Sequence, residues 1–279
     1  MIPLTAIAFI FSFFMIYRQN YKYIIIAMGF LFMGYVGAKR GLWLYLPVVL
    51  STGIFFYFKI IESKTIPKRL IRSSVIIMIF SVLTIILGAK YTRSLNPENK
   101  IGGSFELNYL KNYTIDYTFS TSSEDELSQG RGANFISVIT NMKSAKWINL
   151  LFGYGPESGK GVATYGEGIW KTLGVNGPIT GLTYHLVQLG ILSNILIVFI
   201  IIRLSLSFLS LSKSESDPYL KAIIFGGFMV TIVFFIDFLT YSNSFFSTLF
   251  PLSFSFAYFS AIIYKTSGKS RNYLITARI

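Results

Sequence analysis

The chain contains no cysteine, a single histidine and few charged residues. Of its 279 residues, 13% are charged, whereas 53% are hydrophobic. The lack of cysteine excludes disulfide bonds and thiolate metal sites. The low charged fraction, with a mean hydropathy of +0.58, excludes an ordinary soluble domain and is typical of a protein with several membrane spans.

Long apolar segments hold most of the hydrophobic residues. A bilayer core of about 30 Å requires about 20 mainly apolar residues in a helix. The segments that qualify predict an all-α polytopic membrane protein with about seven transmembrane helices: Ile2–Tyr17, Tyr23–Ala38, Leu42–Phe58, Ser73–Ala89, Gly181–Ile202, Ala222–Tyr241 and Phe245–Tyr264. The amino terminus lacks the charged region and cleavage site of a signal peptide, so Met1 is expected to begin a helix.

The Lys and Arg residues are unevenly distributed over the connections. Fourteen lie in one set of connections, against Glu62, Glu215 and Asp217, whereas residues 90–180 hold nine against eight acids. Because cations accumulate in short cytoplasmic connections, the first set is expected inside and residues 90–180 outside. The net charge of +13 then follows from topology and does not indicate nucleic-acid binding.

This topology predicts four parts. Residues 1–89 form an amino-terminal bundle of four spans, and residues 90–180 form a large extracytoplasmic loop domain. Residues 181–265 form a carboxy-terminal bundle of three spans, and residues 266–279 form a cytoplasmic tail. The absence of cysteine and the frequent Lys and Ile favour a bacterial inner membrane, with the loop periplasmic or extracellular.

The loop is too rich in aromatic and β-branched residues to be a disordered linker. Residues 115–119 alternate in a weak strand pattern. From Asn134 the spacing changes to that of an amphipathic helix, which is expected to lie on the membrane surface beside Trp147. The apolar face of this helix comprises Phe135, Val138, Ile139 and Met142.

Several ionisable groups are expected at the outer ends of the spans. At 1.5 Å per residue along a continuous helix, His185 lies about 27 Å from Arg203, and Asp237 lies about 24 Å from Lys221. Lys39–Arg40 follow the second span at the same level. Ionisable groups at such depth are candidates for function. Ordinary roles stay open for each: lipid-phosphate contacts for the cations, a structural ion pair for the carboxylate and an interfacial position for the imidazole.

Arg131 lies within Gly130-Arg131-Gly132, which opens the amphipathic helix. Free N–H groups at a helix amino terminus, next to a guanidinium group, form a receptor for phosphate or diphosphate. The alternative is an arginine that is solvated or paired with the acids of residues 124–126.

Three motifs resemble the carboxy-terminal half of the O-antigen polymerase and O-antigen ligase superfamily of bacterial membrane glycosyltransferases, whose members have many transmembrane helices and one long periplasmic loop. His185 lies in the region where the family has a His-Asn pair, with Leu186 in place of the asparagine. The motifs are Ala38-Lys39-Arg40-Gly41, Ser128-Gln129-Gly130-Arg131 followed by Phe135, and Leu151-Phe152-Gly153-Tyr154-Gly155-Pro156.

The resemblance implies a glycosyltransferase without a cofactor, acting on a glycan linked to undecaprenyl diphosphate. Metal independence is expected because no pair of carboxylates has metal-ligand spacing, the acids of residues 124–126 being one contiguous run. Arg131 and Arg40, assisted by Lys39, would bind the diphosphate, and Tyr154 would contact the sugar. His185 would be the catalytic base, with Asp237 as a poorer substitute. Expected partners are the lipid-linked glycan, membrane lipid, and the chain-length regulator and flippase of the same pathway.

Three alternatives stay open beside a repeat-unit polymerase, which the small size of the chain favours. The first is a ligase that transfers the glycan to another acceptor. The second is a transporter or flippase for lipid-linked sugars, in which the cations would line a pathway. The third is a shortened member of the superfamily that lacks amino-terminal helices.

Overall fold

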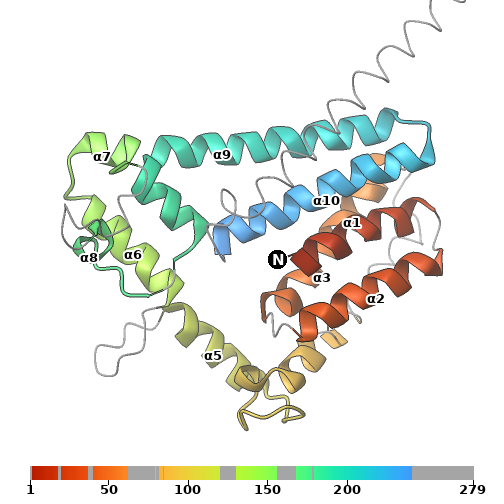
Figure 1. The fold of residues 1–279 in the computed structure, drawn as a ribbon, viewed down its shortest axis with the longest axis horizontal. Helices are drawn as coiled ribbons and strands as arrows, with labels where there is room; N and C mark the ends of the chain where they lie inside the picture. The colour runs from red at the N-terminus through yellow and green to blue at the C-terminus, as the bar shows by residue number, and fades with distance from the viewer. Residues whose placement is uncertain are drawn as a thin grey trace, which may run out of the picture. The chain divides into compact units, whose positions relative to one another are not determined.

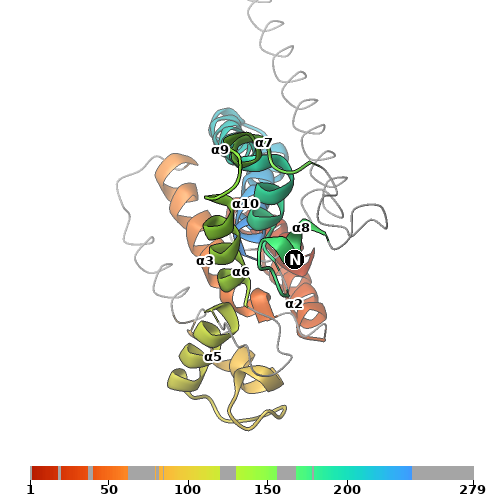
Figure 2. The same ribbon diagram turned by 90° about the vertical axis from the view of Figure 1, so that its left-hand side faces the viewer.

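All regular secondary structure among the described residues of the computed structural model is helical, which confirms the predicted helical character (Figures 1 and 2). The described residues are 2–17, 20–36, 40–61, 79, 82–83, 85–119, 130–155, 168–177 and 179–240. Their elements are α1 (Ile2–Ile16), α2 (Tyr21–Val36), α3 (Arg40–Phe56), η1 (Tyr57–Ile61), η2 (Arg93–Leu95), α5 (Leu107–Phe119), α6 (Arg131–Met142), α7 (Trp147–Phe152), α8 (Ile169–Thr172), α9 (Gly181–Ser214) and α10 (Pro218–Thr240).

Three of the described helices are long and apolar enough to cross a membrane, which supports a membrane protein. They are Leu42–Ile61, Gly181–Ser214 and Pro218–Thr240. Two shorter apolar helices, Pro3–Ile16 and Lys22–Gly34, fall on the first two predicted spans. The predicted span at residues 73–89 lies largely outside the described residues and the one at 245–264 wholly outside them, so the count of seven stays a prediction.

The chain divides into two compact units, and each is described by itself. Unit 1 comprises residues 1–84, 202–234 and 248–279, and unit 2 comprises residues 85–201 and 235–247. Both α9 and α10 contribute to each unit. The predicted boundaries of the four parts follow topology in a membrane and stay a prediction.

Unit 1 packs α1 closely against the amino-terminal part of α10. A Cβ atom at Gly226 would lie 2.4 Å from the ring of Phe9, so only glycine allows this approach. The Ser12 hydroxyl donates a hydrogen bond of 2.7 Å to the carbonyl of Ala222, and Val230 packs against Phe9. Small residues and hydroxyl groups are the usual means by which apolar helices associate in a membrane.

Asn96 organises the first turn of unit 2, which follows the helical residues 85–91. Its side chain is fully buried, and Gly103 lies against it. Its Oδ1 atom accepts a hydrogen bond of 3.2 Å from the N–H of Lys100. Its Nδ2 atom lies 2.8–3.4 Å from four carbonyl oxygens, those of Ala89, Lys90, Thr92 and Lys100.

Replacing Asn96 with aspartate should therefore destabilise unit 2. The substitution keeps the shape of the side chain but directs a carboxylate oxygen at carbonyl oxygens, and loss of a buried hydrogen-bond partner costs about 1–3 kcal/mol, more for a charged group. Thermal unfolding of purified protein in detergent would show a lower Tm. Asn112→Asp, at an exposed position of α5, is the matched control. Equal melting temperatures for the two variants would contradict the role of Asn96.

The strand expected around residues 115–119 is wrong, because these residues belong to α5. Leu110 of α5 is buried against Ala89 and Leu95, and Tyr113 packs on the same cluster. The spacing from 110 to 113 is that of one helical face. The alternation that predicted a strand covered too few residues to compete with this packing.

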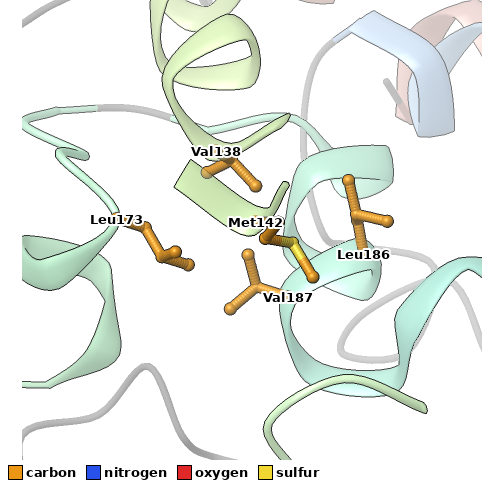
Figure 3. Packing of buried hydrophobic residues seen from close by; sticks show 5 residues of the cluster. All are labelled: Val138, Met142, Leu173, Leu186 and Val187. Atoms are coloured by element: carbon orange, nitrogen blue, oxygen red, sulfur yellow. The ribbon is translucent and has the colours of Figure 1, made fainter. Parts of the chain in front are cut away.

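The amphipathic helix expected from Asn134 is present as α6, but its apolar face packs against protein and not against lipid. Val138 and Met142 face Leu173, Leu186 and Val187 in a buried cluster (Figure 3). The periodicity correctly predicted which residues share a face. It could not distinguish a protein surface from a lipid surface, because both bury apolar side chains.

Candidate functional site

Helix α9 is broken at Gly190, within its predicted membrane span. Gly190 has φ 74° and ψ −175°, and α9 therefore consists of two helical halves, residues 181–189 and 191–214. Figure 1 shows the change of direction. The depth of His185 counted along one straight helix from Arg203 is therefore wrong, since the chain turns between the two residues. For Asp237 the count follows the continuous helix α10.

The turn after α7 holds the end of the first half of α9. The backbone N–H of Tyr154 donates a hydrogen bond of 2.8 Å to the carbonyl of Val187, and that of Gly155 donates one of 3.0 Å to Gln188. A Cβ atom at Gly153 would lie 2.4 Å from the Gln188 carbonyl oxygen, so this residue must be small. Carbonyl groups that lose their helical partners at the break are thus satisfied by another segment.

The end of α10 lies against both halves of α9. Phe238 is buried with Ile197 and Ile201 of the second half, and Leu182 of the first half packs on the same cluster. The ring of His185 stacks on Phe238 with a centroid distance of 5.8 Å. His185, three residues after Leu182, therefore faces the end of α10.

Two carboxamide side chains lie on this side of α9, on either side of the break. Gln188 is one turn after His185, and Asn194 is one turn before Ile197. Both are more than nine-tenths buried. The Nδ2 atom of Asn194 donates a hydrogen bond of 3.1 Å to the Gly190 carbonyl, which directs the side chain at the break.

Within the described part of the chain, one donor and one acceptor of these carboxamides are buried without a hydrogen bond. They are Nε2 of Gln188 and Oδ1 of Asn194. A buried polar group without a partner costs about 1–3 kcal/mol, so such groups call for an explanation. We use the name elbow site for His185, Gln188 and Asn194 of α9 together with Asp237 of α10.

Asp237 is included in the elbow site because it precedes Phe238, on which His185 stacks. His185 and Asp237 are 1% and 2% exposed, and both belong to unit 2. Ionisable residues in membrane helices are rare and are kept for function or for a specific partner. The structure thus brings the predicted base and the predicted carboxylate to the same end of unit 2.

Tyr154 and Arg131 also lie in unit 2. Tyr154 packs on the cluster that contains Leu186 and Val187, beside His185 in the chain. Arg131 is the first residue of α6, with its Nε atom buried. It lies about 10 Å, or seven residues along the helix, from Val138 in that cluster.

The polar face of α6 fixes the segment that leads into α9. Asn141 Nδ2 donates a hydrogen bond of 2.8 Å to the carbonyl of Leu173, and the Ser137 hydroxyl donates to the same oxygen at 3.1 Å. Asn134 Oδ1 accepts one of 3.1 Å from the N–H of Asn176. The helix that begins with Arg131 is thereby tied to the segment that precedes α9.

The predicted place of Arg40 and Lys39 beside the elbow site stays untested. Arg40 is the first residue of α3 and belongs to unit 1. Lys39 lies outside the described residues. Their role beside Arg131 and His185 stays a prediction.

Sequence reasoning missed Gln188, Asn194 and the break itself. A signal was present, since a glycine stands between two carboxamides inside a long apolar segment. Glycine within a helical segment marks a possible break, and polar residues in a span mark buried contacts.

The described residues contain no group of three His, Asp or Glu side chains that could hold a metal ion. Metal independence stays a prediction.

The described residues form a helical fold with three helices that are long and apolar enough to cross a membrane, and one of these, α9, is broken beside buried polar residues. Comparison with known proteins finds no matching family model, no similar curated protein and no similar solved structure.

Proposed function

We propose that the protein is a membrane glycosyltransferase that polymerises oligosaccharide repeat units carried on undecaprenyl diphosphate. The observation that supports it most is the elbow site, where a buried imidazole and a buried carboxylate accompany two carboxamides with open hydrogen-bonding atoms. These groups suit a hydroxyl acceptor, which needs one group to take its proton and others to orient its oxygen. The three motifs that resemble those of the O-antigen polymerase and ligase superfamily favour this substrate class.

In the proposed reaction the acceptor hydroxyl attacks the anomeric carbon of the lipid-linked glycan. A new bond forms between the acceptor oxygen and the anomeric carbon, and the bond from that carbon to the diphosphate oxygen breaks. The diphosphate leaves with the electron pair, and a ring nitrogen of His185 accepts the hydroxyl proton. Asp237 orients the imidazole or substitutes for it as base.

The hydroxyl can both accept and donate hydrogen bonds, which fits the two carboxamides. Nε2 of Gln188 is a donor and Oδ1 of Asn194 is an acceptor. A hydroxyl oxygen between them would accept from the first and donate to the second before it reacts. Tyr154, held beside Val187, would contact the sugar ring.

Arg131 has the second essential role, stabilisation of the leaving diphosphate. Guanidinium groups bind phosphate oxygens through two parallel hydrogen bonds, and the first turn of α6 adds free backbone N–H groups. Arg40 and Lys39 would assist.

The proposal also includes seven spans, an inner-membrane location with residues 90–180 outside, and cooperation with a flippase and a chain-length regulator.

Replacing Arg131 with lysine should slow polymerisation strongly while leaving the protein folded. Lysine keeps the charge but loses the bidentate contact, so we expect a loss of about tenfold to a hundredfold, in proportion to one charge-assisted hydrogen bond of about 1.5–3 kcal/mol. The rate of lipid-linked substrate consumption in proteoliposomes measures this. Lys143→Arg, at an exposed position after α6, is the control. Wild-type rates for Arg131→Lys would remove the arginine from the proposed site.

The decisive test of function is purified protein with a defined lipid-linked repeat unit. A polymerase forms lipid-linked chains of two or more units from this substrate alone. Chains that form only after addition of a second acceptor indicate the ligase, and transfer of unchanged substrate between leaflets indicates the flippase. If the substrate stays unchanged in all three assays, the proposed function is wrong.

A further inference from the structure

Helix α7 exposes large apolar side chains although it lies outside the predicted spans. Trp147 is 70% exposed, Ile148 48% and Phe152 58%. Positions 147, 148 and 152 share one side of the helix, and Leu150 on another side packs into the buried cluster of unit 2. The exposed face is therefore held outward by the packing of the opposite face.

This apolar face is firmly attached to the broken span. The residues that follow α7 donate backbone hydrogen bonds to the carbonyls of Val187 and Gln188. The carbonyl of Leu151 lies so close to Gly190 that a Cβ atom there would be 2.2 Å away. Helix α7 is thus placed at the level where the second half of α9 begins.

The second half of α9 continues the exposed apolar surface. Ile191 and Leu192, directly after the break, are 38% and 45% exposed, and Ile195 one turn further is 62% exposed. An apolar span of this length has its exposed side chains in lipid. Since α7 adjoins the first residues of this face, its own apolar face lies at the edge of the hydrocarbon region.

The residues that precede α7 suit the headgroup region. Lys143 and Lys146 are exposed and lie within four residues of Trp147. Tryptophan is enriched at the membrane–water interface, and lysine reaches anionic headgroups from there. A contact with a second protein chain would not require a tryptophan and two lysines beside these apolar side chains, at the end of a lipid-facing span.

We infer that α7 is an interfacial anchor, with Trp147, Ile148 and Phe152 inserted into the lipid at the end of the α9 span. The partner of this surface is the lipid bilayer itself. The anchor fixes the height of the elbow site relative to the headgroups, because both are tied to Gly190. The inference rests on exposure and backbone contacts and does not depend on the proposed function.

Fluorescence of Trp147 in proteoliposomes tests the anchor. Trp147→Phe is a surface substitution, so the difference between the emission of the wild-type protein and this variant isolates Trp147 from Trp43 and Trp170. We expect this difference emission to be lost in phosphatidylcholine vesicles with bromine atoms near the top of the acyl chain. Bromine near the chain end should cause a smaller loss, and aqueous iodide almost none.

Two outcomes would overturn the inference. Loss of the Trp147 emission with iodide but not with brominated lipid would place α7 in water. Protection from both quenchers would place it under protein, such as a second copy of this chain. The emission of the Trp147→Phe variant comes from buried Trp43 and partly buried Trp170, and this reference signal should be quenched less than that of Trp147.

Discussion

Replacing His185 with phenylalanine is expected to abolish most of the glycosyl transfer without unfolding the protein. The phenylalanine ring retains the stacking on Phe238 but has no nitrogen to accept the hydroxyl proton. General base catalysis contributes about 10²–10⁴-fold to rates, so the variant should lose activity on that scale. The initial rate of polymer formation from the lipid-linked repeat unit measures the loss, and Tm in detergent reports folding.

A second substitution separates the catalytic role of His185 from its packing role. His185→Gln keeps polar atoms but removes the ring, so it should lose both activity and some stability. If only the packing of the ring matters, the His185→Phe variant keeps the wild-type activity and the His185→Gln variant loses it. If proton transfer matters, neither variant is active. Phenylalanine with the wild-type rate would therefore reduce His185 to a packing residue.

The pH dependence gives an independent readout of the same role. In the wild type, the rate should rise with pH as the essential base loses its proton, because only the deprotonated ring nitrogen can accept the hydroxyl proton. The residual rate of His185→Phe should lack this rise. A residual rise that disappears on further replacement of Asp237 with asparagine would assign it to the carboxylate as the substitute base.

The sequence predicted the helical class and the position of several apolar helices, because long apolar runs have few alternatives. Leu42–Ile61 and Pro218–Thr240 lie close to the expected segments. Helix α9 continues past the expected end of the fifth span at Ile202 to Ser214. Arg203 is expected at the inner membrane face, and the sequence did not predict how far the helix extends beyond that face.

The sequence predicted two of the four residues of the elbow site. His185 and Asp237 were selected because ionisable residues are rare in apolar helices, and both are buried in unit 2. Gln188 and Asn194 were not selected, because uncharged polar residues in a span are common enough to lack a distinct signal. Their role follows from the backbone at Gly190, which depends on a contact with Leu151 far away in the chain.

The same dependence explains why the sequence did not predict what the faces of α6 and α7 contact. Periodicity correctly assigned Val138 and Met142 to one face, and Trp147 is exposed. The partner of each face depends on tertiary contacts, namely those that bury α6 against α9 and leave α7 outside. Local spacing contains no information on such contacts between distant segments.

Replacing Gly190 with alanine is expected to disrupt the elbow site severely. The added Cβ would lie 2.2 Å from the carbonyl oxygen of Leu151 and 2.5 Å from the nitrogen of Phe152, both backbone atoms that cannot rotate away. The backbone conformation of Gly190, with φ 74° and ψ −175°, adds a cost of about 1–3 kcal/mol for an L side chain.

Alanine also favours a straight helix over the break, since it is the best helix-forming residue. A straight α9 would lose the hydrogen bonds from Tyr154 and Gly155 and would separate Gln188 and His185 from the end of α10. We therefore expect a lower Tm, faster proteolysis of the segment around α7, and loss of polymer formation. Limited proteolysis of the purified protein, followed by mass spectrometry, would locate the opened segment.

Gly102→Ala is the matched control for Gly190→Ala. Gly102 also has a positive φ, of 81°, but a Cβ atom there would meet nothing within 4 Å. The control therefore carries conformational strain without the steric conflict, and the excess effect at Gly190 measures the contact with α7. If the two variants have the same Tm and the same sites of proteolytic cleavage, Leu151 does not hold the break in α9. The contact argued to shape the elbow site would then be wrong.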